Sequence, residues 1–175
     1  MNDGLYARLL GEAWMRLPDS VRMSMTPPLE AEGTLRIVRP QSGIAGWVVT
    51  RIELPPAGEA VPTLLRLTED DQGVLWERTF EEVRAVSRQW ERHGRIIESA
   101  GPFQLEMRLQ TDGECVRYIQ TGLRLLGVRV PRLFGPQVRG LIGPGPTERS
   151  WSVRVEINHA LLGAICRYEG VMHAR

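Results

Sequence analysis

Apolar and polar residues alternate along most of the chain, the pattern of β-strands that bury one face. Three pairs of such segments are separated by short polar or glycine-containing turns, so each pair predicts a β-hairpin. The predicted hairpins join Val61–Leu67 to Val74–Phe80, Val83–Trp90 to Arg95–Ser99, and Phe103–Leu109 to Cys115–Gln120. Single strands are predicted over Gly33–Val38, Trp151–Ile157 and Ala164–Met172.

Two regions break the alternation. Glycines and prolines punctuate residues 123–146, so we expect no long regular element there. The glycine-rich part, residues 140–145, is expected to be a loop and not a phosphate site, because no helix follows it. Residues 44–54 fit either a helical face or a β-branched strand, and we slightly favour a short helix.

The first segment predicts an amphipathic helix. Its apolar residues recur every three to five positions, a capping residue precedes them, and Pro18 ends the pattern. The stripe comprises Leu5, Leu9, Leu10, Ala13 and Trp14, and the cap is Asn2 or Asp3.

The elements together predict a mainly β (α+β) fold. We expect a curved antiparallel meander or an open barrel of about eight strands, with the N-terminal helix packed on it. No linker or internal repeat interrupts the 175 residues, so residues 1–175 are expected to form a single domain.

Composition narrows the possible functions. All 22 basic residues are arginine, which excludes Schiff-base, P-loop and general-base lysines. A net charge of +1 argues against nucleic-acid binding. There is neither an apolar run of about 20 residues nor a signal-peptide pattern, so we expect no integral membrane insertion and a cytoplasmic location.

Motifs for known chemistry are missing. The histidines (His93, His159, His173) and the cysteines (Cys115, Cys166) lack metal-ligand spacing, and no serine lies in a nucleophile elbow. We therefore predict no catalytic, cofactor-binding or metal-binding residues and no cofactor. Whether the chain is an enzyme stays open, with the balance against it. An active site would require Arg78, His159 and a carboxylate to share one cleft.

One charged residue is expected to face the interior. Trp76, Arg78 and Phe80 lie on the same face of the predicted strand Val74–Phe80. If the two aromatic side chains point into the concave side of the sheet, Arg78 does too, and a buried guanidinium needs a carboxylate partner or an anionic ligand. A neighbouring glutamate is the favoured partner. These three residues are the ligand-binding candidates, and a fatty-acid-like anion is one ligand that they suit.

Several segments together resemble a bacterial domain family of unknown function, DUF4166. They are Leu5–Gly11, Leu54–Gly58 with Val61–Pro62, Trp76–Phe80, Gly101–Phe103, Leu126–Pro131, Leu161–Gly163 and Arg167–Gly170. The resemblance implies no activity. It implies members that stand alone or follow saccharopine-dehydrogenase-like or short-chain-dehydrogenase-like domains, so an accessory role here is expected to act in trans.

Two functions are therefore carried forward. The first is a non-catalytic module that binds a hydrophobic or amphipathic small molecule in the concave face of the sheet. The alternative is an interaction or accessory domain that acts with a dehydrogenase-like oxidoreductase partner. The oligomeric state is left open.

Overall fold

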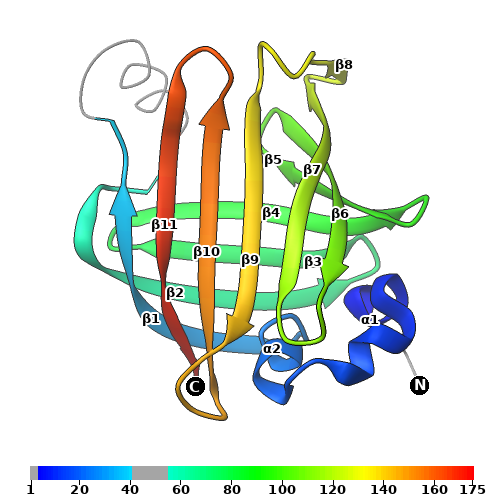
Figure 1. The fold of residues 1–175 in the computed structure, drawn as a ribbon, viewed down its shortest axis with the longest axis vertical. Helices are drawn as coiled ribbons and strands as arrows, with labels where there is room; N and C mark the ends of the chain where they lie inside the picture. The colour runs from blue at the N-terminus through cyan, green and yellow to red at the C-terminus, as the bar shows by residue number, and fades with distance from the viewer. Residues whose placement is uncertain (1–3, 41–54) are drawn as a thin grey trace.

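The fold was determined as a computed structural model, which describes residues 4–40 and 55–175 (Figure 1). The helix expected over residues 44–54 and the helix cap expected at Asn2 or Asp3 lie outside the described residues. The segment before β1 contains three short helices: α1 (Leu5–Leu10), the 3₁₀ helix η1 (Gly11–Arg16) and α2 (Asp19–Met23).

Eleven strands follow in the described residues. They are β1 (Leu29–Val38), β2 (Gly58–Asp70), β3 (Gly73–Phe80), β4 (Val83–Arg92), β5 (Arg95–Ala100), β6 (Phe103–Thr111), β7 (Val116–Leu125), β8 (Val128–Arg129), β9 (Pro136–Pro144), β10 (Ser150–His159) and β11 (Gly163–Ala174). All pairings among them are antiparallel, and the three predicted hairpins are confirmed as β2–β3, β4–β5 and β6–β7.

The sheet is closed. Neighbouring strands run from β6 back through β5, β4, β3, β2 and β1, and then through β11, β10, β9 and β7, while β6 also pairs with β7. Ten described strands thus form a barrel, and the two-residue β8 is added to the edge of β7. The mainly β, antiparallel class is confirmed, but the expected curved meander or open barrel of about eight strands is wrong in strand number and in closure. Figure 1 shows β6, β7, β9, β10 and β11 as a front layer crossing over β2, β3 and β4.

The missed strand, β9, lies in the region expected to be irregular. It pairs with β10 along its whole length and with β7 over four residues. Its prolines stand at its two ends, where a missing N–H costs least. Gly140 lies against the ring of Tyr118, where a Cβ atom would come within 3.3 Å of the tyrosine Cβ. Close packing therefore selects this glycine inside a strand, and the expected loop over residues 140–145 is wrong.

The N-terminal helices close one end of the barrel. The single helix expected up to Pro18 is broken at Gly11, whose φ of 55° ends α1. α1 packs against β4 and β6, and α2 packs against β9 and β10. The apolar side chains of Leu5 in α1, Val21 in α2 and Met25 just after α2 are at most 3% exposed, so this end of the interior is filled.

Two glycines let β1 and β11 approach closely. A Cβ atom at Gly33 would lie 2.2 Å from the Val171 carbonyl oxygen, and one at Gly170 would lie 2.3 Å from the Thr34 carbonyl oxygen. Both contacts are with backbone, which cannot rotate away.

We therefore expect Gly33→Ala to lower the free energy of unfolding by about 1–3 kcal/mol, because the added methyl group must push the two strands apart. Urea unfolding followed by circular dichroism measures the change. Thr34→Ala, at the next and exposed position of β1, is the control and is expected to change stability by less than about 0.5 kcal/mol. Equal effects of the two substitutions would contradict the close-approach explanation.

Candidate functional site

A cavity of about 620 Å³ lies inside the barrel and begins at Trp76 and Tyr118, which contact the N-terminal segment. Most of its lining is aliphatic or aromatic: Leu35, Leu65, Trp76, Phe80, Leu105, Met107, Val138, Ile142, Val153, Val155, Ile157 and Tyr168. It extends to Gly101 and Pro102 in the β5–β6 turn, which are exposed, so the cavity reaches the surface there. The β5–β6 turn belongs to the barrel end opposite the helices.

Arg78 points into this cavity. Trp76 and Phe80 are 6% and 2% exposed, and the period of two places Arg78 on the same inward face of β3. The Arg78 guanidinium carbon lies 4.8 Å from the centre of the Trp76 ring, a cation–π contact. The orientation predicted for these three residues is thus observed, while their role toward a ligand stays a prediction.

The expected carboxylate partner of Arg78 is Glu98 of β5. One guanidinium nitrogen lies 3.7 Å from Glu98 Oε1, and another donates a hydrogen bond of 3.2 Å to Ser87 Oγ. Both charged side chains are mostly buried, at 22% and 14% exposure. The strand register allows this contact. Arg78 of β3 and Ser87 of β4 lie on adjacent strands, and Ser87 lies close to Glu98 of β5 across the β4–β5 pair.

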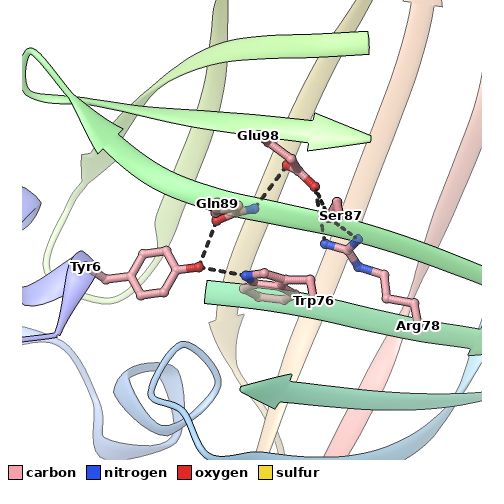
Figure 2. Close-up of polar contacts among 6 residues, drawn as sticks. All are labelled: Tyr6, Trp76, Arg78, Ser87, Gln89 and Glu98. Carbon is pink, nitrogen blue, oxygen red and sulfur yellow. Dashed lines mark hydrogen bonds and ion pairs between the residues drawn. The ribbon is translucent and has the colours of Figure 1, made fainter. Parts of the chain in front are cut away.

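A hydrogen-bond chain connects the ion pair to the N-terminal helix (Figure 2). Ser87 Oγ donates to Glu98 Oε1 at 2.6 Å, and the Gln89 amide donates to Glu98 Oε2 at 3.0 Å. The amide oxygen of Gln89 accepts from the Tyr6 hydroxyl at 2.7 Å, and that hydroxyl accepts from the Trp76 indole at 2.8 Å. The helix is therefore fixed to the barrel wall by polar as well as apolar contacts.

All three tyrosines of the chain lie in this interior. Burial raises the pKa of Tyr6 and of Tyr118 well above the ordinary value, and it raises the pKa of Tyr168 to about 12. Tyr118 Oη donates to the sulfur of Met25 at 3.2 Å. The Tyr168 ring contacts Phe80 edge-on and lines the cavity, and no hydrogen-bond partner of its hydroxyl is found among the described residues.

Other candidate groups do not join the site. His159 lies in the β10–β11 connection, where its Nδ1 accepts the N–H of Leu161, and it does not line the cavity. Cys166 is buried, and burial raises its pKa to about 11, so at neutral pH it is a protonated thiol and a poor nucleophile. In residues 4–40 and 55–175, no group of three His, Cys, Asp or Glu side chains is placed to hold a metal ion.

The described part of the cavity combines an apolar volume with one mostly buried ion pair and the Tyr168 phenol at its wall. Sequence reasoning missed Ser87, Gln89 and Glu98. The alternation over Val83–Trp90 does put Ser87 and Gln89 on one face, which is the signal that could have revealed them.

Comparisons with known proteins identify the family. The model described as "Domain of unknown function (DUF4166)" matches residues 20–172. The chain is a DUF4166 domain. The resemblance found in the sequence is thereby confirmed. A search of the curated proteins gave no match for the DUF4166 domain.

Among solved structures, the DUF4166 domain is similar to a protein of unknown function from the DUF3598 family of Nostoc punctiforme. The TM-score is 0.55 at 12% sequence identity, and the match covers 85% of this chain and 47% of that one. The chain thus spans about half of that protein, and the likeness concerns the fold alone.

The expectations of an oxidoreductase partner and of a cytoplasmic location stay predictions. None of the described helices has the length and apolar character needed to cross a membrane.

The tyrosine environment predicts the alkaline behaviour of the DUF4166 domain. Below pH about 10 the phenols are protonated in the folded and unfolded chains, and the stability from their raised pKa values is fully present. Between about 10 and the pKa of Tyr168, about 12, the unfolded chain releases protons that the folded chain keeps, so the free energy of unfolding falls as pH rises. Tyrosinate absorbance is expected to stay low in this window until the chain unfolds. A phenol that titrates at its ordinary pKa in the folded protein would contradict the burial.

Substitutions at Arg78 and Glu98 test the ion pair. Arg78→Met and Glu98→Gln each leave one mostly buried charge without its partner and are each expected to lower the free energy of unfolding by about 2–3 kcal/mol. The double variant leaves neither charge, so its loss is expected to be about 1–2 kcal/mol smaller than the sum of the single losses. Urea unfolding of the four proteins gives this coupling. Strict additivity would mean that the two side chains do not interact.

Proposed function

We propose that this DUF4166 domain binds an apolar or amphipathic small molecule inside its barrel. The observation that carries the proposal is a 620 Å³ cavity with a mostly apolar lining, a polar cluster around Arg78 and Glu98, and the separate hydroxyl of Tyr168. Pockets for small molecules are typically roughly 300–1,000 Å³, apolar, and supplied with a few convergent polar groups that fix orientation.

The polar cluster favours a neutral head group. Arg78 already faces Glu98 at 3.7 Å, so the two formal charges cancel at the cavity wall. An anion would gain the guanidinium but would also meet the carboxylate, and so the fatty-acid-like anion considered from the sequence is the less favoured ligand. A hydroxyl, carbonyl or amide group can bond to this pair without adding a charge to the interior.

Tyr168 provides a second polar contact. The Tyr168 hydroxyl lies at the cavity, and no hydrogen-bond partner for it is found among the described residues. The Phe80 ring contacts the Tyr168 ring edge-on. A ligand oxygen there gains a hydrogen bond that the empty protein does not make, so binding depends on this hydroxyl while folding does not.

Binding can be measured with N-phenyl-1-naphthylamine, a neutral apolar dye whose fluorescence rises in apolar surroundings. We expect saturable binding that dodecanol displaces more effectively than dodecanoate. Val155→Trp is expected to weaken dye binding at least about tenfold, because the indole fills space in the cavity. Leu64→Trp, on the outward and 46% exposed face of β2, is the matched control and is expected to bind like the unchanged protein.

Tyr168→Phe separates binding from folding. We expect dodecanol affinity to fall about three- to tenfold, the value of one hydrogen bond, with the urea midpoint nearly unchanged. Absence of saturable dye binding, or equal binding by Val155→Trp and the unchanged protein, would rule out the cavity as the site. Preferential displacement by dodecanoate would overturn the neutral-head assignment.

A further inference from the structure

Large apolar side chains are exposed together at the barrel end away from the helices. We call them the rim patch: Leu125 at the end of β7, Leu126, Val128, Leu133 and Phe134 from the β7–β9 connection, and Leu161 from the β10–β11 turn. Leu126 is 80% exposed, Val128 70% and Phe134 66%. Isolated exposed apolar residues are ordinary, whereas groups of them on neighbouring segments are typical of interaction surfaces.

The two connections lie side by side. β9 and β10 pair up to the last residues before the turns, with Pro136 opposite His159. The β10–β11 turn that carries Leu161 therefore lies next to Phe134, which immediately precedes β9. Figure 1 shows the β10–β11 turn, the start of β9 and β8 at the same end of the molecule.

The segment that carries most of the rim patch has an excess of positive charge. Residues 116–147 contain five arginines and no acidic residue. Three of them are exposed at this end: Arg124 near the end of β7, Arg129 in β8 and Arg132 before β9. Acidic residues at this end belong to other strands and turns: Glu59 lies at the start of β2, Glu81 and Glu82 form the β3–β4 turn, and Glu106 of β6 lines a surface hollow with Arg124 and Arg129.

The rim patch adjoins the cavity. The Leu126 N–H donates a hydrogen bond of 2.9 Å to the carbonyl oxygen of Pro102, and Pro102 lines the cavity where it reaches the surface. A surface that binds the rim patch therefore lies beside the opening of the cavity.

We infer that the rim patch docks onto the surface of an anionic lipid bilayer. Leucine and phenylalanine side chains on protruding turns insert at the acyl boundary, and arginines around them meet anionic head groups while their stems stay in apolar surroundings. A second copy of this chain fits less well, because a symmetric contact through the patch would oppose arginine with arginine. Docking needs no occupied cavity, so it can hold or fail independently of the proposed ligand binding.

Co-sedimentation with vesicles tests the docking. We expect the protein to bind vesicles of phosphatidylcholine and phosphatidylglycerol in equal parts, to bind phosphatidylcholine alone at least about tenfold more weakly, and to be released by salt. The double variant Leu126→Ser/Phe134→Ser is expected to lose at least about tenfold in partitioning. Arg129→Gln/Arg132→Gln is expected to lose a similar factor and much of the salt dependence.

Met15→Ser is the matched control, since Met15 is 70% exposed but lies in η1 at the closed end. It is expected to bind vesicles like the unchanged protein. Unchanged urea midpoints show that the variants are folded, and the arginine pair still tests the docking if the apolar pair does not fold. Three results would each overturn the inference: no vesicle binding, equal binding to neutral and anionic vesicles, or equal loss in Met15→Ser. Dye binding without vesicles reports separately on the cavity.

Discussion

Pairing of β6 with β7 is the interaction on which the interior of this domain depends. Without it, the strand order describes a long open sheet with exposed edges, which invite pairing with other chains. With it, ten strands each have two neighbours, and every second side chain is enclosed. A register shift between Glu106 and Met107 lies within this closing pair, where an extra residue on β7 increases the local twist and helps the sheet to curl.

Enclosure then decides the chemistry of the polar residues. A guanidinium facing inward from β3 has no bulk water to solvate it, so the fold supplies Glu98, Ser87 and the Trp76 ring. Every fully buried side-chain nitrogen or oxygen in the described residues has a hydrogen-bond partner. Because Tyr6 belongs to this network, the position of the N-terminal helix is tied to the polar wall of the cavity as well as to apolar packing.

The sequence predicts features within one strand or hairpin better than features that depend on the closure of the barrel. Alternation of apolar and polar residues locates the hairpins and places Arg78 on the same face as Trp76 and Phe80, since both depend only on the period of two. The partner of Arg78 depends on the register across two strand pairs, and a pattern along one strand does not contain that register. β9 escapes detection because Gly140 packs against Tyr118 and the two prolines stand at the strand ends, and hydrophobicity records neither constraint.

The same limit applies to the cavity, because the size of inward residues decides whether a closed sheet is filled or hollow. Toward the helices, the inward positions carry bulky groups such as Leu67 and Val74, and α1 and α2 add their own side chains. Away from them, Ala85 and Ala100 face the cavity. Small residues preserve the alternation of apolar and polar positions along a strand. Each nevertheless leaves empty the volume that a larger inward side chain would fill. Larger residues there would convert the binding cavity into ordinary core with the register and the barrel unchanged, so the capacity to bind depends on side-chain size at a few positions.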